Sequence, residues 1–295
     1  MEIGVVFPQT EIGGDVEKVR LYASSVEQLG YRHVMIYDHI LGADPATHQN
    51  WSGYYDVHTT FHEPFVLYGF LAGITSLDLL TGIIVLPQRQ TALVAKQAAE
   101  IDLLTRGRFR LGVGLGWNAV EYEAMGKSFR DRGRRIEEQV TLLRRLWSEP
   151  SVTFKGQYER VTGAGLAPAP LQRPIPVWFG GESSPAYERA GRLADGWIPD
   201  HMVPGAKLDA AKAEVEAAAE RAGRDPAKLG LQARIRWGNK GVADLGIGRL
   251  VEMVEQWRIS GATHIAINTM DAGLANIEAH IEVLQECAEA LKLGT

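Results

Sequence analysis

Short apolar or β-branched runs alternate with segments of helical periodicity along the whole chain. This alternation is typical of parallel strands joined by crossover helices. Strands are predicted over residues 3–7, 33–37, 80–86, 109–115, 176–180, 196–199, 231–236 and 264–268. Helices are predicted over residues 16–29, 93–104, 134–147, 184–193, 207–222, 250–260 and 277–291. Eight strands in 295 residues match the size of a (β/α)8 TIM barrel, so we expect an α/β chain with one domain over residues 1–295. A doubly wound open sheet is the rival fold, but it has fewer strands and its phosphate-binding glycines follow the first strand.

Two segments do not fit the repeat and are predicted to be insertions after the second and fourth strands. Residues 41–61 are rich in aromatic side chains, and residues 148–174 are rich in glycine and proline. Long loops after barrel strands lie on the catalytic face, where they act as lids or specificity walls.

Composition excludes several classes of function. The formal net charge of -5 and the isoelectric point near 5.9 give no basic surface for nucleic acid. A single cysteine, Cys287, excludes an intramolecular disulfide framework and fits a reducing compartment. No signal sequence or long uncharged run is present, so we expect a cytoplasmic protein with no membrane partner.

The segment Gly107–Trp117 passes from an apolar run into Gly112, Gly114 and Gly116. This spacing leaves the strand end open, and we expect something flat to lie on that backbone. A dinucleotide fingerprint is the alternative, but the third glycine comes too early and no acidic residue follows about 20 residues later. A Rossmann site is therefore disfavoured.

Asp38 and His39 directly follow the second predicted strand. In a barrel they lie at the carboxyl-terminal rim, where active sites are found. His39 is a candidate proton donor or acceptor near neutral pH. The alternative is that Asp38 caps a loop and His39 packs against it.

A second candidate site follows the fifth predicted strand, where Gly180, Gly181, Glu182, Ser183 and Ser184 precede a helix. Glycines, two hydroxyl groups and the positive end of a helix dipole suit a phosphate. An ordinary helix cap is the alternative, because serine is a common N-cap residue.

Gly82 interrupts a β-branched run in the third predicted strand, which indicates a bulge or a close approach by a ligand. From these residues alone, a plain bulge is favoured. His58, His62 and Glu63 lie close together but lack the spacing of a metal site, so no metal is expected. No nucleophile elbow is present either, which disfavours nucleophilic hydrolysis.

The motifs together resemble the luciferase-like monooxygenase superfamily, in its branch of deazaflavin-dependent (coenzyme F420) oxidoreductases. The resemblance covers nearly the whole chain and is carried by residues 37–39, 81–89, 107–117, 132–135 and 178–181. It implies a TIM barrel with insertions, in agreement with the strand count.

The resemblance also implies how a cofactor binds. The tricyclic ring would lie over the strand ends, supported by a bulge and a non-prolyl cis peptide at Gly82–Ile83. The phosphate would lie at Gly180, Gly181, Glu182, Ser183 and Ser184. Asp38 and His39 would contact the deazaflavin and stabilise its reduced anion or relay a proton, while the cofactor itself carries the hydride.

Trp117 departs from the pattern of the sugar-phosphate dehydrogenases of this superfamily, which have a catalytic glutamate there. We therefore expect Trp117 to lie at the cofactor ring and to favour a flat, apolar substrate. The predicted activity is hydride transfer between coenzyme F420 and a small organic molecule, in a homodimer by resemblance. The alternatives are an FMN-dependent monooxygenase on the same fold, and a non-catalytic member.

Overall fold

The computed structural model describes residues 1–238 and 246–294, and its centre is a closed barrel of eight parallel strands. In order around the barrel these are β1 (Glu2–Val6), β2 (His33–Ile36), β3 (Asp78–Thr81), β5 (Phe109–Gly114), β8 (Val177–Gly180), β9 (Gly196–Ile198), β10 (Gly230–Arg236) and β11 (His264–Asn268). Pairing of Ile3 with Ile265 closes the ring between β1 and β11. The predicted TIM barrel is confirmed.

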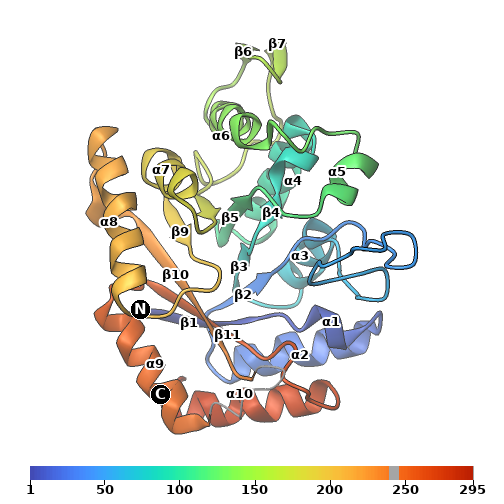
Figure 1. Cartoon of the computed structure of the whole chain (residues 1–295), viewed down its shortest axis with the longest axis vertical. Helices are drawn as coiled ribbons and strands as arrows, with labels where there is room; N and C mark the ends of the chain where they lie inside the picture. Colours follow the sequence, from blue (N-terminus) through green and yellow to red (C-terminus); the bar gives the residue numbers. More distant parts are fainter. Residues whose placement is uncertain (239–245, 295) are drawn as a thin grey trace.

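Helices surround this barrel, and Figure 1 shows them on the outside of the strands. They are α1 (Gln9–Ile12), α2 (Val16–Gln28), α3 (Pro64–Ala72), α4 (Thr91–Leu104), α5 (Ala119–Ala124), α6 (Arg132–Ser148), α7 (Ser184–Leu193), α8 (Ala206–Arg221), α9 (Ile247–Ile259) and α10 (Ile277–Leu291). Short 3-10 turns occur at Leu86–Gln88 and Pro226–Lys228. The sequence pattern did not predict α1, α3 or α5. All three are short, and α3 is apolar along almost its whole length, so it has no polar stripe to reveal its period.

The glycine-rich and proline-rich segment contains a hairpin that the sequence analysis treated as a loop. Strands β6 (Val152–Lys155) and β7 (Arg160–Ala164) pair antiparallel beside α6 and extend away from the barrel (Figure 1). Glu138 of α6 accepts hydrogen bonds from the backbone N–H groups of residues 157, 158 and 159 at the tip. The hairpin is therefore tied to an outer helix.

The third strand is interrupted at the predicted position. β3 ends at Thr81, the peptide bond Gly82–Ile83 is cis, and the chain resumes as β4 (Ile84–Val85) beside β5. This confirms both the bulge and the cis peptide.

The glycines of β5 accommodate the interruption in its neighbour. A Cβ atom on Gly114 would lie 2.8 Å from Ile83 Cδ1, and one on Gly116 would lie 2.6 Å from Val85 Cγ1. Gly116 also has a φ of +65°, which disfavours other residues. Side chains of the neighbouring strand thus pack closely against these glycines, while Gly114 and Gly116 also border the cavity at the strand ends. That a flat ligand lies on this backbone stays a prediction.

None of the helices in the described part of the chain is long and apolar enough to cross a membrane.

Candidate functional site

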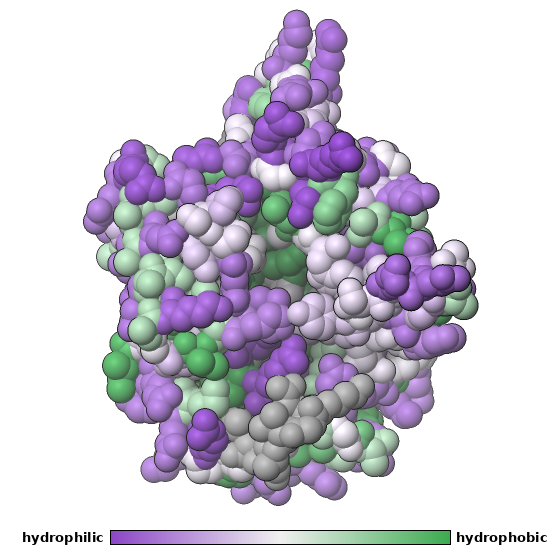
Figure 2. Space-filling model, viewed as in Figure 1, coloured by the Kyte–Doolittle hydropathy of each residue, from purple (hydrophilic) through white to green (hydrophobic). Residues whose placement is uncertain are grey.

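A cavity of about 500 Å³ opens at the carboxyl ends of the barrel strands. Figure 2 shows this hollow in the middle of one face, with hydrophobic residues at its bottom and hydrophilic residues around it. The end of β10 and the segments after β2, β3, β5, β8, β9 and β11 all contribute to its wall. This volume lies in the usual range for a pocket that binds a small molecule or cofactor. The 41–61 insertion supplies Tyr54 and Tyr55 to the wall, whereas residues 148–174 supply none of the described lining residues.

Asp38 lines the cavity, but its carboxylate is already engaged. Its Oδ1 lies 2.7 Å from Arg89 Nη2, and its Oδ2 accepts from Arg89 Nε at 3.2 Å and from the Val85 N–H at 3.0 Å. Burial alone would lower the pKa of Arg89, but Asp38 and Glu63 together raise it. The charged pair ties the end of β2 to the turn after β4, so Asp38 holds this wall in place.

His39 lies beside a buried carboxylate that the sequence analysis missed. Its Nδ1 is 3.0 Å from Oε1 of Glu121, whose side chain is only 1% exposed. The same carboxylate accepts from the Ile40 N–H and from Gln88. Glu121 therefore accepts a hydrogen bond from the Nδ1–H group and fixes the orientation of the ring. Among the described residues, none hydrogen-bonds to His39 Nε2.

A sequence signal for Glu121 existed but pointed elsewhere. Asn118 is the N-cap of α5 and accepts from the Val120 N–H, so Glu121 occupies the position of a capping-box glutamate. Only the fold shows that its side chain is directed to His39, 82 residues away in the sequence.

The turn from β8 into α7 forms another part of the wall through Gly180, Gly181 and Ser183. Gly181 has a φ of +140°, and a Cβ atom there would lie 2.9 Å from the Ala186 Cβ. The Ser183 side chain makes no capping hydrogen bond to the helix, so its hydroxyl remains available to a ligand.

Glu182 and Ser184 do not line the cavity. The Glu182 carboxylate accepts from the His201 N–H and lies 3.7 Å from Lys207 Nζ, which directs it away from a bound anion. The Glu182 side chain therefore does not face the cavity, and a contact of residue 182 with a phosphate stays a prediction.

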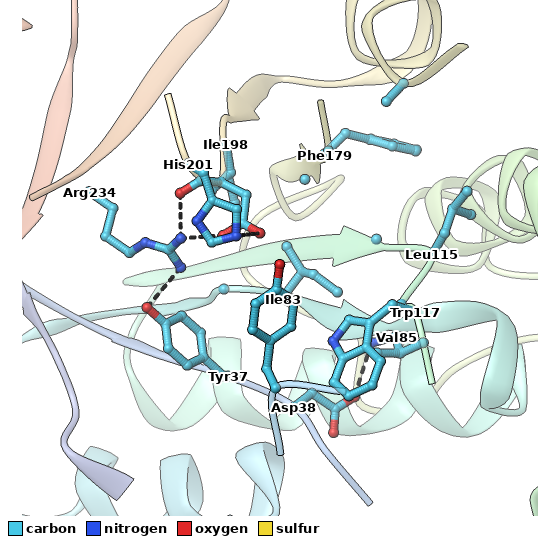
Figure 3. A pocket seen from close by; sticks show the side chains of 18 of the residues that line it. Tyr37, Asp38, Ile83, Val85, Leu115, Trp117, Phe179, Ile198, His201 and Arg234 are labelled. Carbon is cyan, nitrogen blue, oxygen red and sulfur yellow. Dashed lines mark hydrogen bonds and ion pairs between the residues drawn. The ribbon is translucent and has the colours of Figure 1, made fainter. Parts of the chain in front are cut away.

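Tyr37 and Arg234 form the opposite part of the wall (Figure 3). Arg234 Nη1 donates to the Tyr37 hydroxyl at 2.8 Å, and Nη2 donates to Asp200. In Figure 3 this group lies on one side of Ile83, and Asp38, Val85 and Trp117 lie on the other. Arg234 could not be predicted from the sequence, because a lone arginine in a strand belongs to no recognisable motif.

Aromatic rings cover the cavity near His39. The His39 ring lies 5.2 Å from Tyr55 and 5.5 Å from Trp117, measured between ring centroids. Tyr54, which is 76% exposed, lies 5.9 Å from Trp117 and 6.2 Å from His201. The aromatic insertion thus forms the wall that its composition predicted.

The model of the family described as luciferase-like monooxygenase matches residues 1–237. The chain belongs to this family.

Named relatives within the luciferase-like family use two kinds of cofactor. The chain is 31% identical over 238 residues to an F420-dependent hydroxymycolic acid dehydrogenase of Mycobacterium tuberculosis, covering 79% of this chain and 61% of the relative. It is 34% identical over 171 residues to an FMNH2-dependent dimethylsulfone monooxygenase of Pseudomonas fluorescens, covering 56% of this chain and 45% of the relative. These matches thus span roughly half to three fifths of the relatives' own lengths.

Solved structures support the fold. An F420-dependent secondary alcohol dehydrogenase in complex with an F420-acetone adduct superposes with a TM-score of 0.81 at 20% identity, over 98% of both chains. The coenzyme F420 dependent tetrahydromethanopterin reductase of Methanopyrus kandleri gives a TM-score of 0.72 at 16% identity, over 96% of this chain and 97% of that one. Both agree with the TIM barrel described above.

The structure brings most predicted site residues of this luciferase-like chain to one cavity. Those that line it are Asp38, His39, Gly82, Ile83, Trp117, Gly180, Gly181 and Ser183. The missed lining residues that carry charge are Arg189, Asp200, Arg234, Arg236 and Asp271. Within the described residues no cluster could hold a metal ion.

Proposed function

We propose that the protein is an oxidoreductase that transfers hydride between coenzyme F420 and a small organic substrate. The observation that carries this proposal is the His39–Glu121 pair in the wall of a cavity large enough for a tricyclic ring and a small molecule. Removing hydride from an alcohol also releases a proton, so such an enzyme needs a positioned base. The F420-dependent relative that matches 79% of the chain supports the choice of cofactor.

The residues present fit a deazaflavin with a phosphate-bearing tail. Gly180 and Gly181 permit close approach of a ligand to the backbone, and Ser183 offers a hydroxyl beside the start of α7. Ser184 begins that helix and would contribute its backbone N–H. Ile83 presents an apolar surface in the middle of the cavity, against which a flat ring would lie (Figure 3).

When bound, the deazaflavin would supply a carbon centre that accepts or donates hydride. The protein would supply the proton chemistry. Glu121 holds Nδ1 of His39, so Nε2 would take the proton from the substrate hydroxyl in oxidation and return it in reduction. The Asp38–Arg89 pair would keep the neighbouring wall in place without transferring a proton. Trp117 and Tyr55 would limit access of water and favour a flat, apolar substrate.

An FMN-dependent monooxygenase is the alternative, supported by the dimethylsulfone monooxygenase relative. Both cofactors share the ring system and the first phosphate, so the residues at Gly180–Ser183 fit either one.

Binding measurements separate the two cofactors. Purified protein is titrated separately with F420 and with FMN, each oxidised and reduced, and affinity is measured by quenching of tryptophan fluorescence. We expect tighter binding of F420. Tight stoichiometric binding of FMN with no response to F420 would replace the proposal by the monooxygenase. Loss of F420 absorbance with a panel of alcohols then tests hydride transfer.

A further inference from the structure

One arginine in the cavity wall differs from the other two. Arg189 forms an ion pair with Glu137, and Arg234 forms one with Asp200. Arg236, at the end of β10, also lines the cavity, but among the described residues it has no hydrogen bond or ion pair. A guanidinium in a cavity wall without a partner is suited to bind an anionic ligand.

The Tyr37 hydroxyl supplies a second, independent observation. Its oxygen accepts from Arg234 Nη1 at 2.8 Å and from Asn268 Nδ2 at 3.2 Å. A phenol oxygen that accepts two hydrogen bonds must donate its own proton elsewhere. No described residue accepts that proton, and Tyr37 lines the cavity. Burial raises the pKa of Tyr37 although Arg234 opposes this, so the phenol stays protonated.

The strand register places these groups at the same end of the cavity, because Arg236 pairs with Asn268 across β10 and β11 and Asn268 donates to the Tyr37 hydroxyl. Burial and then Tyr37 raise the pKa of Tyr55, Asp271 raises it further, and Arg236 lowers it. Arg236 also acts on the pKa of Tyr37. The Asp271 carboxylate lines the same end and has no partner among the described residues, so its negative charge opposes an anion there.

We propose that this end of the cavity is a subsite for a carboxylate group of the substrate, bound by Arg236 through an ion pair and by Tyr37 through a donated hydrogen bond. The inference rests on the proposed function, since the carboxylate belongs to the molecule that exchanges hydride. The aromatic rings of Tyr55 and Trp117 in the same cavity make an aromatic carboxylic acid the substrate class that fits. Asp271 restricts the subsite to ligands with one negative charge.

The test compares benzoate with benzamide, which has nearly the same shape and no charge. Affinity is measured by calorimetry for the protein with and without its cofactor. We expect benzoate to bind at least about tenfold more tightly than benzamide, the size of one charge-assisted interaction. Equal affinity for the two compounds in the unsubstituted protein would overturn the proposal.

Two substitutions should shift this preference in opposite directions. Arg236→Gln should weaken benzoate binding by about tenfold or more and change benzamide binding by less than about twofold. Asp271→Asn should strengthen benzoate binding, because it removes a negative charge. Arg32→Gln, an exposed arginine at the other end of the barrel, makes the same charge change and should leave both affinities unaltered. If Arg236→Gln weakened the binding of benzoate and benzamide equally, the proposal would be contradicted. Unchanged affinity for benzoate in Arg236→Gln would contradict it as well.

Two further results separate this inference from the proposed function. The preference for benzoate is measured without turnover and also without cofactor. The subsite can therefore be confirmed or refuted whether or not the protein binds F420. If Gly181→Asp abolished benzoate binding and Arg236→Gln did not, the carboxylate would bind at the start of α7. That result would overturn the proposed subsite at Arg236 and Tyr37. Tyr37→Phe should weaken benzoate less than Arg236→Gln does, because it removes a neutral donor.

Discussion

The two ends of the barrel both contain buried polar side chains, yet they differ in what these side chains face. At the carboxyl end, His39, Asp38 and Arg234 have specific partners and border a cavity of about 500 Å³. At the amino end, His33, Arg110 and Gln232 lie inside the barrel, and each keeps at least one buried polar atom without a partner among the described residues.

Packing explains the amino end. The Trp178 side chain occupies the space beside Gly196 and Gly230, and the Arg110 guanidinium lies over its ring at 5.0 Å from the centroid. Burial lowers the pKa of His33 well below its usual range and that of Arg110 to about 10. Polar residues enclosed in this way oppose folding when charged, whereas polar residues beside a cavity are available to a ligand.

The largest effect is expected at His39. His39→Ala should lower turnover by roughly ten- to ten-thousandfold, the range for a positioned acid or base, with a smaller loss of cofactor affinity. Steady-state rates at saturating F420 and a separate cofactor titration measure the two quantities. Unchanged turnover would show that His39 only packs against its neighbours. The carboxyl end of the barrel would then have no demonstrated catalytic residue to set it apart from the amino end.

Substitution of its partner should have a smaller effect. Glu121→Gln keeps the shape of the side chain but removes the charge that fixes the His39 tautomer, so turnover should fall by about ten- to a hundredfold. Unchanged turnover in a folded Glu121→Gln protein would show that Glu121 does not position His39 for catalysis.

Gly181→Asp tests the phosphate end of the cavity. The substitution adds a side chain at a φ of +140° and a negative charge where an anion would bind. We expect cofactor affinity to fall by about ten- to a hundredfold, with the fold retained in circular dichroism. Unaltered binding by a folded variant would place the phosphate at the loops after the last two barrel strands.

The amino end should respond to acid rather than to ligands. Because burial lowers the pKa of His33 and lowers that of His264 to about 3, the unfolded chain binds protons below about pH 6.5 that the folded chain does not. Stability is therefore fully present above about pH 6.5 and falls as the pH decreases. Urea unfolding between about pH 7.5 and pH 5 measures this slope. His33→Gln should flatten it, and an unchanged slope would assign the acid sensitivity to other groups.

The smallest effect is expected for Arg110→Met. The side chain keeps its packing against Trp178 and loses a buried charge, so the free energy of unfolding near neutral pH should change by less than about 1 kcal/mol. Since Arg110 contributes to the lowered pKa values of His33 and His264, acid sensitivity should decrease slightly. A large destabilisation would show that Arg110 stabilises the fold through charged interactions, as Arg89 does through its ion pair with Asp38 at the other end.

The sequence by itself determined the barrel and the location of the site along the chain. The alternation of strand and helix periods predicted every barrel strand, and helices α7 and α10 begin and end at the predicted residues. Asp38, His39, Gly82 and Gly181 could be predicted because each belongs to a local pattern at a strand end. Local patterns of this kind depend only on residues that are neighbours in the sequence.

The tertiary structure alone decided the partners. The pairs His39–Glu121, Asp38–Arg89 and Tyr37–Arg234 join residues 82, 51 and 197 positions apart. The same holds for Gly114 and Gly116, which border the cavity and whose lack of a side chain also leaves room for Ile83 and Val85. Closing the barrel brings strand ends together irrespective of their separation in sequence, so which charges meet is fixed only when the ring closes.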